Sequence, residues 1–204
     1  MELAVYVHGK GGSAAEAEHY RPLFPSCAVA GVEYRSLDPR EAGAEIRAQI
    51  ERQAKGYESV VLIANSIGAF FCMAGGVGEL VRKAYFISPV VDMEKLICGM
   101  MASAGVTERE LETRGQIPVP SGETLSWEIL CWLRAHPPGW EVPTEILCGE
   151  RDELAPLADT AAFAAARRAG LTVMKNGEHW FHTQEQMRFL DEWILEKEAA
   201  AGRE

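Results

Sequence analysis

Six short, largely apolar runs recur along the chain, separated by segments whose apolar residues repeat with a helical period. The runs cover residues 3–7, 28–32, 60–64, 84–88, 145–148 and 171–174. They are nearly continuous in apolar character rather than alternating, which is typical of strands in a parallel sheet that helices cover on both faces. The pattern therefore predicts six strands, each buried on both faces.

Helix signals lie between these runs. Asp38 and Pro39 form an N-cap followed by proline at the first helical position, and Ile46 and Ile50 then repeat four residues apart. Further helices are predicted over residues 69–80 and 161–168, and from residue 183, where a capping-box pattern begins the last one. Because strands and helices alternate, we expect an α/β fold with a mainly parallel sheet.

Residues 92–140 break this alternation. The segment predicts helices near 93–103, 107–114 and 126–135, with a Pro- and Gly-rich link at 117–122. We interpret it as a helical cap or lid, inserted over one edge of the sheet into a single domain that spans residues 1–204.

Composition narrows the class of protein. The 204 residues are 48% hydrophobic and 25% charged, as expected for one globular domain. The net charge of −10 argues against a nucleic-acid partner, which Lys and Arg would have to bind through phosphates. No stretch approaches the roughly 18 apolar residues of a membrane-spanning helix, so we expect no membrane span.

The cysteines and the N-terminal residues indicate in which cellular compartment the protein is expected. The five cysteines are odd in number and form no C-x-x-C pair, which suits free thiols in a reducing environment. The N-terminal residues lack the basic region and cleavage site of a signal peptide. The expectation is a cytoplasmic protein.

Polar residues follow four of the predicted strands, and in a parallel sheet such loops meet at one edge. Ser66 stands between the end of one strand and the start of a helix, with the small residues Ala64 and Gly68 two positions away on either side. Such a turn exposes the hydroxyl and places the amide of Ile67 at a helix N-terminus. Ser66 could equally serve as an ordinary helix N-cap.

The other three loops carry a glycine-rich turn, an acidic cluster and two histidines. His8-Gly9-Lys10-Gly11-Gly12 follows the first strand, Gly149-Glu150-Arg151-Asp152-Glu153 follows the fifth, and Gly177-Glu178-His179-Trp180-Phe181-His182 follows the sixth. Metal-ligand spacing is absent, since His179 and His182 alone are too few for a site. We expect no metal and no cofactor.

Together these motifs resemble those of the α/β-hydrolase superfamily, over about residues 2–92 and 143–196. Its nucleophile elbow has the pattern G-x-S-x-G, in which Ala64 replaces the first glycine here, and its H-G-x-G motif follows the first core strand. The resemblance implies a three-layer fold with a minimal sheet of about six strands and helices on both faces. It also implies a serine hydrolase with a small acyl substrate.

The resemblance assigns roles to particular residues. Ser66 would be the nucleophile, Asp152 the acid and His179 the base, in the chain order Ser…Asp…His of this fold. The backbone N–H groups of Lys10 and Ile67 would form the oxyanion hole. His182 is the rival histidine and lies beside the cap of the last helix, whereas His8 is expected to support its loop.

Two other functions remain open. Gly9, Gly11 and Ala14 also satisfy G-x-G-x-x-(G/A) after a strand, and Glu33 could hold a ribose hydroxyl, as in an oxidoreductase that binds NAD(P) or FAD. The second alternative function is that of a binding protein that keeps the hydrolase fold but has no catalytic activity.

The insertion bears on the substrate. Its Met and Trp residues include Met100, Met101, Trp127 and Trp132. They could provide the insertion's own packing or line an apolar acyl pocket. Ester, thioester, amide and C–C bond cleavage share the same machinery, so the sequence does not separate them.

Overall fold

The computed structural model describes residues 1–201 of the chain. These form two compact units, a main unit of residues 1–91 with the chain from 139 onward, and an insertion of residues 92–138. Each unit is described separately below.

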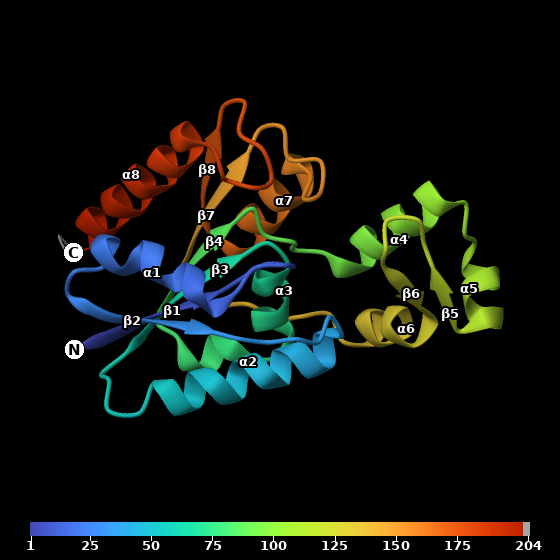
Figure 1. Ribbon diagram of the computed structural model, residues 1–204, viewed down its shortest axis with the longest axis horizontal. Helices are drawn as coiled ribbons and strands as arrows, with labels where there is room; N and C mark the ends of the chain where they lie inside the picture. The colour runs from blue at the N-terminus through green and yellow to red at the C-terminus, as the bar shows by residue number, and fades with distance from the viewer. Residues whose placement is uncertain (202–204) are drawn as a thin grey trace. The chain divides into compact units, whose positions relative to one another are not determined.

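A six-stranded parallel sheet forms the centre of the main unit (Figure 1). Its strands are β1 (Glu2–Val7), β2 (Cys27–Val32), β3 (Val60–Asn65), β4 (Lys83–Ile87), β7 (Thr144–Gly149) and β8 (Gly170–Met174). Their order is β2-β1-β3-β4-β7-β8, and every neighbouring pair is parallel. All six strands predicted from the apolar runs are present, and the expected α/β class is confirmed.

Helices cover both faces of this sheet. They are α1 (Ala17–Tyr20), α2 (Pro39–Gln53), α3 (Ile67–Ala74), α7 (Leu157–Arg167) and α8 (Gln184–Ala201), with 3₁₀ turns at Ala14–Glu16, Arg21–Leu23 and Val77–Leu80. On one face, Tyr6 and Tyr85 of the sheet share a core cluster with Trp193 of α8. Figure 1 shows α8 and α2 on opposite sides of the sheet. The main unit therefore has three layers, with the sheet between two layers of helices.

The two outer strands differ from the prediction that every strand is buried on both faces. All residues of β4 are buried, but most residues of β8 are partly exposed and Val173 is 38% exposed. Residues in β2 are likewise only partly buried. An edge strand has a neighbour on one side only, and the strand order was not available from the apolar pattern.

The helix after Ser66 begins earlier and ends sooner than the predicted range of 69–80. It covers Ile67–Ala74 and is followed by Gly75 and Gly76, of which Gly76 has the left-handed φ of 66°. Glycine adopts this conformation without a steric penalty and commonly ends helices. A separate 3₁₀ turn, Val77–Leu80, then leads to β4.

The insertion contains three helices and a small hairpin. The helices are α4 (Met93–Ala104), α5 (Glu108–Arg114) and α6 (Trp127–Ala135), and their N-cap residues Asp92, Thr107 and Ser126 accept backbone N–H groups. Residues 119–122 of the predicted link do form a turn, but it joins the two strands of an antiparallel hairpin, β5 (Gln116–Pro118) and β6 (Thr124–Ser126), which were not predicted. Strands of three residues are too short to show a recognisable apolar period.

Candidate active site

Three side chains from separate loops form a continuous hydrogen-bonded chain in the main unit. Ser66 follows β3, Asp152 follows β7 and His179 follows β8. The Ser66 hydroxyl lies 2.8 Å from Nε2 of His179, whose Nδ1 lies 2.8 Å from Oδ2 of Asp152. A carboxylate only accepts, so Nδ1–H donates to Asp152 and leaves Nε2 of a neutral ring to accept from the serine hydroxyl.

The turn at Ser66 has an unusual backbone. Its φ of 53° and ψ of −124° lie outside the regions that L residues favour. The Ser66 N–H donates to the carbonyl of Ile87 at 2.9 Å, and the Ser66 carbonyl accepts from the N–H of Val90 at 3.1 Å. These two bonds hold the strained residue in place between β3 and the start of α3.

Close backbone approach makes glycine necessary beside this turn. A Cβ on Gly68 would lie 2.4 Å from the carbonyl oxygen of His8, and a Cβ on Gly9 would lie 3.1 Å from Cβ of Ser66. The start of α3 and the loop after β1 therefore pack directly against each other. This contact places the glycine-rich loop next to the Ser66 side chain.

The Asp152 carboxylate is enclosed by its own loop. Its side chain has no exposed surface, and Oδ1 accepts the backbone N–H groups of Leu154 at 3.0 Å and Ala155 at 2.8 Å. Hydrogen bonds from N–H groups stabilise a buried carboxylate and fix its orientation. Both oxygens lie within 2.9 Å of Nδ1 of His179, so the loop also orients the imidazole.

The two histidines of the last loop have different surroundings. The His179 side chain is 18% exposed and lies between Ser66 and Asp152. The His182 side chain is 43% exposed, its Nδ1 donates to the carbonyl of Trp180 at 2.7 Å, and its ring stacks on that of Trp180. The structure thus brings His179, rather than His182, to Ser66.

The loop after β1 is held in one orientation by bonds to the Gly9 carbonyl. This oxygen accepts from Nδ1 of His8 at 2.7 Å and from the N–H of Gly12 at 3.1 Å. Because the peptide is planar and trans, the N–H of Lys10 points away from that carbonyl. Ile67, the second residue named for an oxyanion hole, is the first residue of α3, where N–H groups have no partner within the helix.

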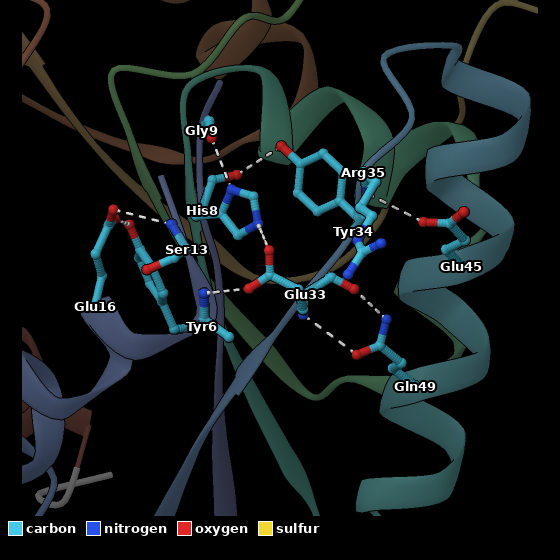
Figure 2. Close-up of polar contacts among 11 residues, drawn as sticks. Tyr6, His8, Gly9, Ser13, Glu16, Glu33, Tyr34, Arg35, Glu45 and Gln49 are labelled. Atoms are coloured by element: carbon cyan, nitrogen blue, oxygen red, sulfur yellow. Dashed lines mark hydrogen bonds and ion pairs between the residues drawn. The ribbon is translucent and has the colours of Figure 1, made fainter. Parts of the chain in front are cut away.

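A polar cluster behind this loop was not found from the sequence (Figure 2). The Tyr34 hydroxyl donates to the carbonyl of His8 at 2.8 Å, and the two rings stack with centroids 4.3 Å apart. Nε2 of His8 is buried, has no hydrogen-bond partner among the described residues, and lies 3.8 Å from Oε1 of Glu33. Tyr34 follows β2 and belongs to no recognisable motif. It reaches the His8 carbonyl because β2 pairs with β1.

The geometry around Glu33 bears on the dinucleotide alternative. Oε2 of Glu33 accepts the N–H of Ala14 at 2.9 Å, and its backbone is bonded to the side chain of Gln49 (Figure 2). The segment after the glycines forms a 3₁₀ turn, Ala14–Glu16, and a four-residue helix rather than a long crossover helix. Glu33 is therefore part of the loop's own support.

The four insertion residues named for an acyl pocket differ in burial. Met101 is 4% exposed and belongs to the insertion core with Leu111 and Leu130. Met100 and Trp127 are partly buried against that core, and Trp132 stacks on His136 with ring centroids 5.0 Å apart. Met101 thus provides packing within the insertion, as the alternative interpretation expects of such residues.

Residues 1–201 hold neither a cluster of metal ligands nor a membrane-spanning helix. In this range no three His, Cys, Asp or Glu side chains come together as a metal site would require. Nor does any helix within it combine the length and apolar character needed to cross a membrane.

Solved structures of other proteins share the fold of this chain, although no sequence comparison matches it. No family model matches the chain, and no curated protein matches it in sequence. Among solved structures, Est1E from Butyrivibrio proteoclasticus superimposes with a TM-score of 0.76 at 14% identity, over 100% of this chain and 89% of that one. Alpha/beta hydrolase domain-containing protein 10 from mouse gives 0.71 at 15% identity, over 98% and 90% of the two chains.

A third match is the monoacylglycerol lipase of Paleococcus ferrophilus, with a TM-score of 0.60 at 16% identity over 95% of this chain and 94% of that one. At these identities the likeness concerns the fold. The parallel sheet, the helices on both faces and these matches agree with the resemblance read from the motifs: the chain has the fold of the α/β-hydrolase superfamily.

Proposed function

We propose that this protein is a serine hydrolase that cleaves a carboxylic ester, or a related acyl bond, of a small substrate through an acyl-enzyme on Ser66. The observation that carries the proposal is the chain of hydrogen bonds from the Ser66 hydroxyl through His179 to the buried Asp152. The serine in this chain of hydrogen bonds has a strained backbone and directly precedes a helix. Nucleophile, base and orienting carboxylate in this sequence are the arrangement that activates a serine hydroxyl.

The reaction follows from these positions. Nε2 of His179 takes the hydroxyl proton while Oγ of Ser66 attacks the acyl carbonyl carbon, and the resulting imidazolium is stabilised by Asp152. The imidazolium then protonates the leaving-group oxygen as its bond to the acyl carbon breaks. In the second half of the cycle His179 takes a proton from water as the water attacks the acyl carbon. His179 then returns that proton to Oγ of Ser66 as the bond to the acyl carbon breaks and the acid leaves.

The negative oxygen of the tetrahedral intermediate needs two donors. We assign them to the N–H groups of Lys10 and Ile67, since Gly9 packs against Ser66 and Ile67 follows it in the chain. Removing one such donor typically lowers kcat about 10²- to 10³-fold. The bonds that hold the Gly9 carbonyl therefore support this role, because they orient the Gly9–Lys10 peptide to which the Lys10 N–H belongs.

Two features of the substrate and setting remain proposals. Met100, Trp127 and Trp132, which are partly exposed, are candidates for favouring an apolar acyl group, whereas Met101 is buried. All five cysteines are free, which suits a reducing, cytoplasmic environment.

Covalent labelling with a fluorophosphonate probe tests the mechanism. We expect one equivalent of adduct on the peptide that contains Ser66, no adduct in Ser66→Ala, and labelling slowed about 10³-fold or more in His179→Ala. Ser103→Ala, a serine substitution on the exposed surface of α4, serves as the matched control and should label at the wild-type rate.

The same labelling experiment, together with a cofactor titration, separates the alternatives. Loss of labelling in His182→Ala with labelling retained in His179→Ala would refute the assignment of the base. A wild-type protein that does not react would favour a binding role. Tight binding of NAD(P) or FAD in a fluorescence titration of the unlabelled protein would favour the oxidoreductase.

A further inference from the structure

Two large apolar side chains are exposed on the loops that carry Asp152 and His179. Trp180, next to His179, is 69% exposed, and Leu154, two residues after Asp152, is 53% exposed. Trp180 is the most exposed large apolar side chain among the described residues. Tryptophan is highly buried on average in folded proteins, so an indole left in water beside a reactive group points to a contact made with something else.

The two loops are packed against each other. A Cβ on Gly149 would lie 2.4 Å from the carbonyl carbon of Gly177, and the N–H of Arg151 donates to the carbonyl of Gly177 at 2.8 Å. Because β7 and β8 are neighbours in the sheet, this contact joins the loops just beyond the strand ends. Leu154 and Trp180 each lie three residues beyond the bonded pair Arg151 and Gly177, on the β8 side of Ser66.

The indole of Trp180 is held rather than loose. Its ring stacks on the ring of His182, with centroids 4.7 Å apart and an angle of 25° between the planes. His182 is itself fixed by the bond from Nδ1 to the Trp180 carbonyl. A side chain that is already ordered loses little conformational entropy when a ligand binds, which favours a role in recognition.

The first step of the proposed reaction indicates which part of a substrate lies near His179 and its neighbour Trp180. As the acyl-enzyme forms, the bond between the acyl carbon and the leaving oxygen breaks, the bond to Oγ of Ser66 remains, and Nε2–H of His179 transfers its proton to the leaving oxygen. That oxygen must then lie within hydrogen-bond distance of Nε2. Trp180 directly follows His179 in the chain, so it is the large apolar side chain nearest in sequence to the group that protonates the departing alcohol.

We propose that Trp180, together with Leu154, binds the alcohol part of the ester and selects apolar or aromatic alcohols. The inference rests on the proposed hydrolase function and concerns its first half-reaction. Hydrolysis of the acyl-enzyme, from which the alcohol has already departed, is independent of Trp180.

Two esters that share an acyl group but differ in their alcohol test this assignment. With benzyl butanoate and methyl butanoate, we expect the wild type to prefer the benzyl ester in kcat/KM. Trp180→Ala should lower kcat/KM for the benzyl ester about tenfold, which is the size of a lost aromatic contact, and change the value for the methyl ester less than twofold. Trp180→Phe should keep most of the preference, and the rate of deacylation should be the same in all three proteins.

A matched pair of leucines gives the second arm. Leu154→Ala should reduce the benzyl preference, whereas Leu195→Ala, at a 47% exposed position on α8, should leave it unchanged. Equal losses for both esters in Trp180→Ala would overturn the inference, because they would show a general effect on His179.

Failure of the proposed function has a different signature. If the wild type neither reacts with the fluorophosphonate nor hydrolyses either ester, the serine mechanism itself is wrong. If it reacts and hydrolyses both esters with equal kcat/KM, the mechanism stands and the assignment of Trp180 is overturned.

Discussion

Ser66 occupies a backbone conformation that costs free energy and that the surrounding structure maintains. A positive φ is rare for a residue with a side chain, and conformations of this kind cost about 1–3 kcal/mol each. The bonds to Ile87 and Val90 and the tight contact at Gly68 hold the residue there. The result is a hydroxyl that lies 2.8 Å from Nε2 of His179, in a residue whose neighbour, Ile67, begins a helix.

This strain can be measured with two variants that lack the Ser66 hydroxyl. Both Ser66→Ala and Ser66→Gly remove the hydroxyl, but glycine adopts a positive φ without a steric penalty. After allowance for the greater flexibility of glycine in the unfolded chain, we expect Ser66→Gly to be more stable than Ser66→Ala by about 1 kcal/mol. Urea unfolding followed by circular dichroism gives the difference. A Ser66→Gly variant less stable than Ser66→Ala by about 0.5–1 kcal/mol, the cost of glycine's flexibility alone, would mean that the turn is unstrained.

At the scale of elements, α2 and α3 approach each other through glycines. A Cβ on Gly43 of α2 would lie 2.8 Å from the backbone nitrogen of Gly75, and a Cβ on Gly75 would lie 2.4 Å from the carbonyl oxygen of Gly43. Backbones in direct contact leave no space for a methyl group. Gly75 is the C-cap of α3, the helix that Ser66 precedes, so this contact fixes the far end of that helix against α2.

A pair of identical substitutions isolates this contact. Gly43→Ala should lower the free energy of unfolding by about 1–3 kcal/mol, because the added methyl group would overpack the contact between the helices. Gly99→Ala, inside α4 where the added Cβ would meet no atom within 4 Å beyond its own helix backbone, should raise it by up to about 1 kcal/mol. Thermal or urea unfolding measures both, and a stabilising Gly43→Ala would contradict the proposed contact.

At the scale of the whole molecule, burial affects a set of groups that ionise at alkaline pH. Burial, followed by the negative charge of Asp152, raises the pKa of the Cys148 thiol to about 11. Burial also raises the pKa of the Cys72 thiol. The hydroxyls whose pKa is raised mainly by burial are those of Tyr6, Tyr20, Tyr34 and Tyr85.

These shifts predict a loss of stability at high pH. A group whose pKa is raised on folding stabilises the protein fully below its unfolded pKa, and that contribution declines as the pH rises toward the folded pKa. The thiols begin to ionise in the unfolded chain near pH 9, so the free energy of unfolding should fall above that pH. The slope is roughly 1.4 kcal/mol per pH unit for each such group.

Urea unfolding at pH 7.5, 9 and 10 measures the decline. The variant Cys148→Ala is the control, because it lacks one of the two buried thiols and should show a shallower slope between pH 9 and 10. A wild-type stability that stays constant up to pH 10 would contradict the effect.

The apolar runs predicted all six strands of the main sheet because each strand is recognised from a few adjacent residues. The motif positions could be found because the loops after parallel strands meet at one edge. The hairpin β5–β6 was missed, since three-residue strands show no period, and so was the partial exposure of the edge strands β2 and β8. The contribution of Tyr34 was missed because its hydroxyl bonds to His8 across two strands rather than within a motif.

By itself the sequence determined the alternation of strands and helices and the loops in which Ser66, Asp152 and His179 stand, because these depend on local composition and chain order. Only the tertiary structure decided that His179 rather than His182 meets Ser66, that Asp152 is fully enclosed, and that Trp180 is exposed. Ser66 and His179 are 113 residues apart. The direction of each side chain depends on how the strands pack together, and the apolar pattern along the chain does not specify that packing.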